Sequence, residues 1–162
     1  MGRTMSIFSS RGFTMVELMV VIVLVSIMAA FSLWGYQALH QSASIKEDVN
    51  KIGTMLKSAR NWAFTRKQEV TVDINGNTTL RARYDSDGDG TADTNIMPAI
   101  SLSEGYAINT GSLVINQRGL YSTTGTVYRT ASSTTASGKQ DCVVVSLARA
   151  ILGKYQSGNC NP

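Results

Sequence analysis

The sequence predicts an α+β protein in which one long N-terminal helix packs on a mainly antiparallel β-sheet domain. The first observation is a long helical pattern, because the chain has no proline between Ser6 and Met97. The second is the alternation of apolar and polar residues that follows, which is typical of half-buried strands. The length of 162 residues allows one modest domain after an N-terminal anchor.

The first half of the expected helix is apolar on every side. From Leu18 to Tyr36 no side chain is charged. A helix of this length spans about 28 Å at 1.5 Å per residue, which is enough for the core of a bilayer. We therefore expect a transmembrane segment over residues 13–36.

Residues 37–67 are expected to continue the helix in amphipathic form. Glu47 and Lys51 stand four residues apart and can form an ion pair on its surface. Trp62 and Phe64 are expected to pack where the helix meets the sheet. The apolar positions that recur at helical spacing are Leu39, Ile45, Val49, Ile52, Leu56, Ala59 and Ala63.

Residues 68–162 are expected to form a β-rich globular domain. Two alternating stretches, 69–74 and 78–84, flank the turn signal Asn75-Gly76-Asn77 and predict a β-hairpin. Residues 123–139, dominated by Ser, Thr, Gly and Ala, are expected to be a flexible connection with one strand at its start. Further strands are predicted near residues 97–102, 113–116, 126–130 and 142–146.

Glu17 stands at the head of the apolar run, where it is out of place. A carboxylate in the bilayer core costs on the order of 3 kcal/mol, and such residues usually mark function. A cleaved secretory signal or a simple membrane anchor would each account for the apolar run. Neither accounts for Glu17.

A third interpretation accounts for it. The stretch Gly12-Phe13-Thr14-Met15-Val16-Glu17-Leu18 follows a short basic leader and resembles the class III signal of type IV prepilins and type II secretion pseudopilins. The resemblance implies a pilin-like fold and a leader, residues 1–12, that a prepilin peptidase removes after Gly12 before Phe13 is N-methylated. It also implies contacts with other pilins or pseudopilins and with an inner-membrane assembly platform.

Processing at this point would explain the carboxylate. Cleavage creates a cationic amine at Phe13, about one helical turn from Glu17. A charge removed from water is tolerated when it is paired, so Glu17 can neutralise this amine in its own chain or in a neighbour. The resemblance implies a bacterial inner-membrane protein with a periplasmic C-terminal domain, which then enters a pilus or pseudopilus.

Within this family, three looser stretches resemble the GspH/FimT group of minor pseudopilins and pilins. They are residues 56–63 with the strand after them, residues 119–126, and residues 143–146. The expected function is structural: a minor subunit that assembles into or primes a type II secretion pseudopilus or a type IV pilus.

The alternative function is a DNA-binding minor pilin for natural transformation. The FimT branch is associated with DNA binding through a C-terminal Gly-Arg-x-Arg motif. Here the matching stretch, residues 147–151, lacks the glycine and the second arginine, which leaves Arg149 and, further on, Lys154 as candidate phosphate contacts. The net charge of +4 includes two leader arginines, so charge alone does not predict nucleic-acid binding.

Cys142 and Cys160 are the only cysteines in the sequence. In a membrane-targeted chain they are expected to form a disulfide, which would stabilise the domain by about 3 kcal/mol. Two free thiols in a reducing compartment remain the alternative.

The stretch from residue 85 to residue 93 resembles part of a calcium-binding loop. Its carboxylates are spaced as in the first half of an EF-hand loop, with glycine in sixth place, but the twelfth place is Ile96 rather than a bidentate Glu. A polar turn is the competing interpretation, and Ca²⁺ is the one cofactor left open. The carboxylates are those of Asp85, Asp87, Asp89 and Asp93.

Catalytic function is not expected. The sequence has one histidine, no phosphate-binding Walker loop and no zinc-ligand spacing. We therefore predict a protein that is not an enzyme.

Overall fold

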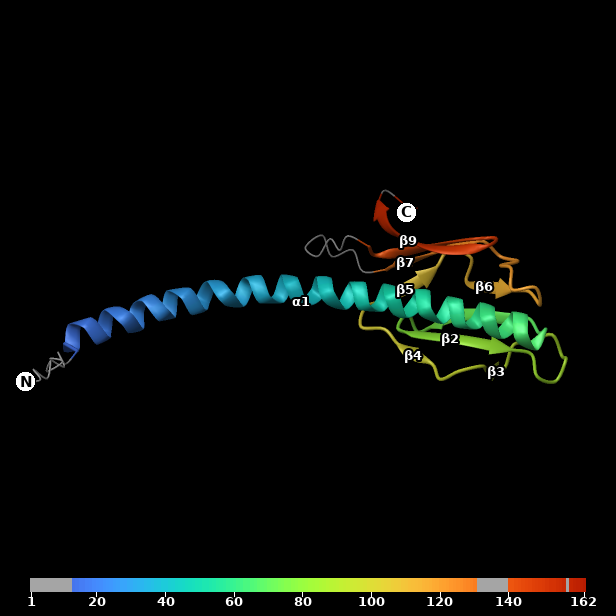
Figure 1. Cartoon of the computed structure of the whole chain (residues 1–162), viewed down its shortest axis with the longest axis horizontal. Helices are drawn as coiled ribbons and strands as arrows, with labels where there is room; N and C mark the ends of the chain where they lie inside the picture. The colour runs from blue at the N-terminus through green and yellow to red at the C-terminus, as the bar shows by residue number, and fades with distance from the viewer. Residues whose placement is uncertain (1–12, 131–139, 157) are drawn as a thin grey trace, which may run out of the picture. The chain divides into compact units, whose positions relative to one another are not determined.

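The structure is a computed structural model, which describes the backbone of residues 13–130, 140–156 and 158–162, and their side chains except those of 31–39. The expected leader, residues 1–12, and residues 131–139 of the expected flexible connection lie outside the described residues. The chain divides into two compact units, Met1–Gln37 and Ala38–Pro162. Helix α1 (Met15–Arg66) belongs in part to each unit, and the strands belong to the second (Figure 1).

The predicted long helix is confirmed as one continuous helix, which begins two residues after and ends one residue before the expected bounds of 13 and 67. It ends where Lys67 adopts a positive φ of 55°, a conformation that does not continue a right-handed helix. The expected ion pair is present on its surface, with Lys51 Nζ 2.9 Å from Glu47 Oε1. Each partner shifts the pKa of the other in the direction of its charged form: that of Glu47 is lowered and that of Lys51 is raised.

In the described residues ten strands follow the helix and form two five-stranded antiparallel sheets. The first has the order β3-β2-β1-β6, with β4 also paired to β2, and the second has the order β10-β9-β8-β7-β5. The first sheet contains β1 (Val70–Asn75), β2 (Thr79–Tyr84), β3 (Thr94–Asn95), β4 (Ile100–Ser101) and β6 (Ser112–Ile115). The second contains β5 (Tyr106–Ile108), β7 (Gly125–Arg129), β8 (Cys142–Ser146), β9 (Arg149–Gln156) and β10 (Asn159–Asn161).

The predicted hairpin is strands β1 and β2. Asn75 pairs with Thr79, so the connection is three residues long. Gly76 and Asn77 in it have φ of 60° and 66°, a region that glycine and asparagine enter more readily than other residues. The turn signal in the sequence therefore set the register of the hairpin.

Strands β3 and β4 share one edge of β2. Tyr84 pairs with Thr94 at one end of β2, and Leu80 pairs with Ile100 nearer the other. Residues 85–93 consequently leave the sheet as a loop whose two ends are held together. We call these residues the Asp-rich loop.

The second half of α1 packs against both sheets (Figure 1). Gly53 lies against Leu152 of β9, since a Cβ added to it would be 3.5 Å from the Leu152 side chain. Trp62 packs on Tyr84 of β2, with ring centroids 4.8 Å apart. The side chain of Leu39 lies outside the described residues, and Met55 is buried in addition to the expected positions. The expected apolar positions that are buried are Ile45, Val49, Ile52, Leu56, Ala59 and Ala63.

A buried carboxylate fixes the connection between β4 and β5 to the helix. Asp48 has no exposed surface, and its Oδ2 accepts hydrogen bonds from the backbone N–H of Ser103 (2.8 Å) and Glu104 (3.0 Å). Lys51 Nζ lies 3.7 Å from Asp48 Oδ1. Oδ2 is therefore hydrogen-bonded twice, while Oδ1, which has no hydrogen-bond partner among the described residues, is compensated only by the nearby Lys51 charge.

The sequence-based picture needs three corrections. The β-domain consists of two sheets rather than one, because β8 pairs with β9 and β7 while β1 pairs with β2 and β6. The strands β3, β5, β9 and β10 were not predicted. Phe64, expected to pack at the helix–sheet junction, is 54% exposed because it lies on the outer side of the last helical turns.

Candidate functional site

The start of α1 carries the predicted processing and assembly residues. Thr14 precedes the first helical residue, and its Oγ1 accepts a hydrogen bond of 3.2 Å from the backbone N–H of Glu17. Thr14 is therefore the N-cap, and Glu17 is the third helical residue. This Thr-x-x-Glu spacing is the capping-box signature, a signal that the sequence reasoning missed.

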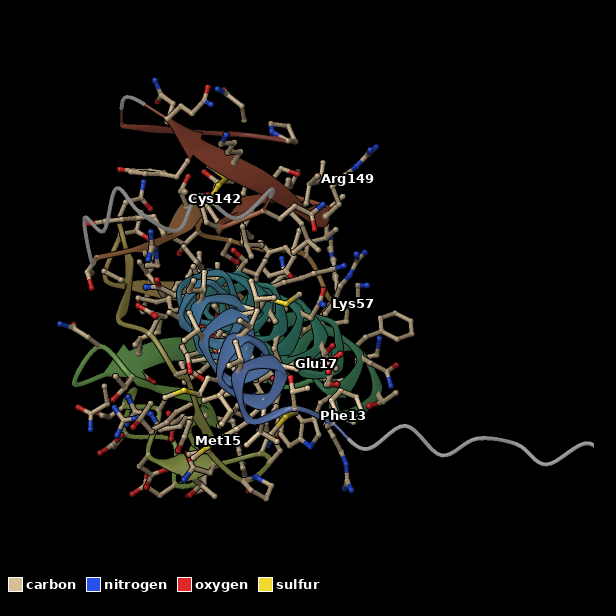
Figure 2. The ribbon with its side chains drawn as sticks, turned by 90° about the vertical axis from the view of Figure 1, so that its left-hand side faces the viewer. Phe13, Met15, Glu17, Lys57, Cys142 and Arg149 are labelled. Atoms are coloured by element: carbon tan, nitrogen blue, oxygen red, sulfur yellow. A yellow bond between two sulfur atoms is a disulfide. The ribbon has the colours of Figure 1, made fainter. Side chains whose placement is uncertain are left out.

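Glu17 thus stands where two effects favour a carboxylate. It lies in the first turn of the helix, where the partial positive charge of the backbone N–H groups favours an anion. Phe13, 76% exposed, lies just before the helix, and Figure 2 places both residues at this end of the ribbon. Gly12 lies outside the described residues, and the pairing of Glu17 with a new Phe13 amine stays a prediction, because that amine forms only on cleavage.

Beyond Glu17 the helix presents apolar side chains to its surroundings on all sides. Those of Leu18, Ile22 and Leu24 are each 56% exposed, and the neighbouring residues are similar. No helix among the described residues is both long enough and apolar enough to cross a membrane. The transmembrane segment expected over residues 13–36 is not confirmed, and its side chains from residue 31 onward lie outside the described residues.

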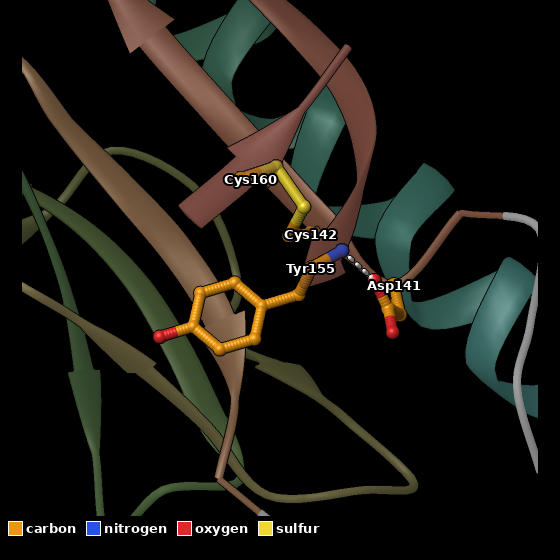
Figure 3. The surroundings of a disulfide bond; sticks show 4 residues. All are labelled: Asp141, Cys142, Tyr155 and Cys160. Carbon is orange, nitrogen blue, oxygen red and sulfur yellow. Dashed lines mark hydrogen bonds between the residues drawn. A yellow bond between two sulfur atoms is a disulfide. The ribbon is translucent and has the colours of Figure 1, made fainter. Parts of the chain in front are cut away.

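The predicted disulfide between Cys142 and Cys160 is present, with the two Cα atoms 6.0 Å apart. It links β8 to β10 across β9 (Figure 3). Asp141, next to Cys142, accepts a 2.6 Å hydrogen bond from the backbone N–H of Tyr155 on β9. The covalent bond and the carboxylate together hold the edge of the second sheet.

The Asp-rich loop brings together three of the four carboxylates that sequence analysis singled out for calcium. Oxygens of Asp85, Asp87 and Asp89 all lie within 4.8 Å of one another. Asp93 does not join them; its Oδ1 instead accepts hydrogen bonds from the hydroxyls of Ser86 and Thr94.

The same loop is shaped by its own backbone. Both oxygens of Asp85 accept backbone N–H groups, from Gly88 (2.7 Å) and Gly90 (2.8 Å). These hydrogen bonds lower the pKa of Asp85, and the Thr94 and Ser86 hydroxyls lower that of Asp93. Hydrogen bonding therefore favours the ionised form of Asp85 and Asp93, and it leaves lone pairs on the Asp85 oxygens for a metal ion.

The two residues proposed for DNA contact do not lie together. Arg149 begins β9 and Lys154 follows five residues later on the same strand, roughly 17 Å away at 3.4 Å per residue. Because side chains alternate along a strand, an odd separation points them to opposite faces.

Arg149 instead lies beside a cluster of cations that sequence analysis missed. Arg60 of α1 donates a 2.5 Å hydrogen bond from Nη1 to the carbonyl oxygen of Ala148, the residue before Arg149. Figure 2 shows Arg149 and Lys57 projecting from the same side of the molecule. Next to them is a groove of about 380 Å³, which we call the cationic groove; it is lined by Lys57, Arg60, Asn61, Phe64, Arg118 and Gly119.

Two local features build this groove. The four helical lining residues occur at spacings of three and four, so they share one face of α1. Arg118 is brought to them by a turn in which Asn116 Oδ1 accepts the backbone N–H groups of Arg118 and Leu120. Gly119, with φ of 73°, fits against the helix, where an added Cβ would be 3.3 Å from that of Phe64.

Comparison with known proteins identifies the family. Residues 7–33 match the prokaryotic N-terminal methylation motif, a range that includes Gly12, Phe13 and Glu17. Residues 48–148, well over half of the chain, match the model of the type II transport protein GspH. No curated protein and no solved structure matches the chain. On the second match, the chain belongs to the GspH family of type II transport proteins.

Proposed function

We propose that this protein is a minor subunit that assembles into or primes a type II secretion pseudopilus or a type IV pilus. One observation carries the proposal: the match to the methylation motif falls on a helix start at which Glu17 heads a run of exposed apolar side chains. Membership of the GspH family supports the same role. The role is structural and needs no catalytic site.

In this proposal a prepilin peptidase cuts between Gly12 and Phe13 and methylates the Phe13 amine. The exposed apolar side chains after Glu17 are then covered by the helices of other pilins or pseudopilins, which is the hydrophobic driving force for assembly. The membrane-associated assembly platform is the expected site of this step. Inside such a bundle the cationic amine and the Glu17 carboxylate neutralise each other.

Mass spectrometry of the protein from cells that contain a prepilin peptidase tests the processing step. We expect a mature N-terminus at Phe13 with one added methyl group. The variant Gly12→Val should keep the full leader, whereas Gly2→Val, which changes a leader glycine far from the cut, should be processed normally. A wild-type chain that retains residues 1–12 in such cells would contradict the proposal.

Two substitutions at Glu17 separate its charge from its place in the helix cap. Glutamine also serves as the third residue of a capping box, so Glu17→Gln preserves helix initiation but removes the charge. We expect both Glu17→Gln and Glu17→Ala to be processed but to be lost from filaments sheared from the cell. Filaments that contain Glu17→Gln at the wild-type level would show that capping, and not charge pairing, is what Glu17 contributes.

A further inference from the structure

Strand β9 is paired along one edge but only in part along the other. From Arg149 to Gly153 its residues pair with β8. On the opposite edge β10 pairs with it only from Lys154 onward, and Asn161 of β10 lies against Gly153. In the part of the chain that the structure describes, no strand pairs with residues 149–152 on that edge. We call residues 149–152 the open edge.

The open edge is suited to accept a further strand. An uncovered strand edge presents backbone N–H and C=O groups that can pair with another extended chain, and proteins usually protect such an edge with charged side chains. Arg149 is the one charged residue of the open edge. Ile151 is 36% exposed on its outer face, whereas Ala150 and Leu152 are half-buried against the core.

Helix α1 runs alongside the open edge. Gly53 lies against Leu152, and Arg60, further along the helix, donates its hydrogen bond to the carbonyl oxygen of Ala148, which comes earlier in the chain than Leu152. The helix and β9 therefore run in opposite directions, one beside the other, over this stretch.

The helix also shows what a strand added to the open edge would cover. Lys57 follows Gly53 by four positions, so it lies about 40° further round a helix of 3.6 residues per turn. Leu56 lies on the other side of Gly53 and is buried, whereas Lys57 is exposed. A strand beyond β9 would therefore pass over Lys57, which Figure 2 shows on the same side of the molecule as Arg149.

The cationic groove continues the line of the open edge. Arg60, which lines the groove, bonds to Ala148 in the turn just before Arg149. The lining contains three positive side chains and no acidic residue, and Lys57 and Arg118 are exposed. Among the described residues none of the three forms an ion pair. Like charges held close together repel one another, so the groove favours an anionic ligand.

We propose that the open edge binds an extended segment of a different protein, in which acidic and apolar side chains alternate. The segment adds to the sheet as a strand beside β9. Because side chains alternate between the two faces of a strand, its carboxylates lie over Lys57 and the cationic groove, and its apolar side chains lie beside Ile151. The inference rests on the proposed function in one respect, that a minor subunit is surrounded by subunits of other kinds.

A single-stranded nucleic acid is the competing anion, and this surface is poorly equipped for it. Such strands are bound by exposed aromatic platforms along a basic track. Phe64 is the one aromatic residue in the lining of the groove, and the ammonium of Lys67 lies 4.0 Å from its ring centroid. The open edge also offers backbone pairing, which a peptide can satisfy and a nucleic acid cannot.

A labelled synthetic peptide tests the contact on the purified full-length chain in detergent micelles. The probe has about eight residues of alternating glutamate and valine, enough at about 3.4 Å per residue to span the open edge and reach the groove. Fluorescence anisotropy at about 50 mM salt measures its affinity, because charged contacts are weakly screened there. A peptide with lysine in place of every glutamate is the matched probe of opposite charge.

Two exposed lysines of α1 separate the groove from charge in general. Lys57→Glu and Lys46→Glu change the net charge equally, but only Lys57 lines the cationic groove. We expect Lys57→Glu to bind the acidic peptide on the order of fivefold more weakly than the wild type and the lysine peptide more tightly. Lys46→Glu should bind both peptides as the wild type does.

Methylation of the peptide backbone separates strand pairing from charge attraction. Two versions of the acidic peptide carry N-methyl groups, one on every valine and the other on every glutamate. Methylation removes N–H donors, and only some of the N–H groups of a strand point toward a given neighbour. We expect one of the two versions to bind at least about tenfold more weakly than the parent peptide, because several hydrogen bonds are lost.

The inference fails if the wild type does not bind the acidic peptide, if Lys57→Glu binds it as the wild type does, or if neither methylated version is weakened. It also fails if another occupant is preferred. That occupant would be a thymidine oligonucleotide that binds the wild type more tightly than the acidic peptide does, or a second copy of the chain, and either would lose its binding in Lys57→Glu.

Failure here is distinguishable from failure of the proposed function. Processing at Phe13 and recovery in sheared filaments are measured without the peptide. Both can be normal in a chain that binds no acidic peptide, which would refute this contact and leave the assembly role standing.

Discussion

The two halves of α1 have the same backbone conformation and opposite surroundings. Leu24 in the first half is 56% exposed, whereas Leu56 in the second half has no exposed surface. The second half meets both sheets through a side chain at every third or fourth position, while the first half is apolar on all sides. The comparison teaches that helix formation and helix burial are separate properties here, because the second half packs within its own chain and the first half is helical with its apolar side chains exposed.

The largest expected effect comes from removing the same side chain in the two halves. Leu56→Ala should lower the free energy of unfolding of the globular domain by about 2–5 kcal/mol, because it leaves a cavity among buried groups. Leu24→Ala should leave that free energy unchanged. Denaturant unfolding of both full-length variants, followed by tryptophan fluorescence, measures the difference.

That comparison would break if Leu24→Ala destabilised the domain as much as Leu56→Ala. A second readout sharpens it, because Leu24→Ala should instead reduce recovery in sheared filaments.

The next effect concerns the disulfide, which belongs to the packed region alone. Replacing Cys142 and Cys160 together by alanine should lower the free energy of unfolding by about 3 kcal/mol, since the unfolded chain gains the freedom of an open loop. Helix content measured by circular dichroism should stay unchanged in the folded variant. As a control, reductant should lower the free energy of unfolding of the wild type by the same amount. It should not lower that of the double variant any further.

A smaller, pH-dependent effect involves Tyr106, which is buried on β5. Burial, and then the nearby carboxylate of Asp48, raise the pKa of its hydroxyl above the usual value. A raised pKa contributes stability that is fully present below the pKa of the unfolded chain, about 10, and is lost as pH rises above it. The free energy of unfolding of the wild type should therefore fall when the pH is raised from 7 to between about 10 and 11. In Tyr106→Phe this fall should be smaller.

The pKa of Tyr121 is raised by burial in the same way, so Tyr121→Phe is the matched comparison. Equal alkaline sensitivity in the wild type and in both variants would contradict this assignment.

The smallest expected effect is calcium binding by the Asp-rich loop. With three converging carboxylates and no bidentate Glu, affinity should be no tighter than about 1 mM, the range of weak extracellular sites. Isothermal titration with the wild type and with Asp87→Asn measures it. Submicromolar binding would show that ligands beyond Asp85, Asp87 and Asp89 complete the site.

The sequence predicted those features that depend on local pattern. The helix, the hairpin with its Gly76-Asn77 turn, strand β8 and the disulfide all follow from periodicity, turn residues or cysteine count. Strand β9 was missed because Gly153 and Lys154 interrupt its alternation, and β10 because it is three residues held by Cys160 and by pairing with β9.

The cationic groove could not be predicted for a different reason. Its helical residues are recognisable as one face, but Arg118 reaches them only because the turn at Asn116 and Gly119 packs against α1. Nothing local in the sequence links positions 57 and 118. The same holds for Asp48, whose role depends on backbone groups more than fifty residues away.

The way the second half of α1 is held has a mechanical consequence. Its buried side chains from Val49 to Ala63 belong to one core with residues of both sheets, along some 21 Å of helix axis at about 1.5 Å per residue. Tension applied along the axis from the first half of α1 therefore loads these contacts at the same time, in shear. The hydrogen bonds of Asp48 add a further attachment at the N-terminal end of the packed part of the helix. A force applied across the axis would load them one after another, so the domain should resist pulling along the helix far better than peeling from it.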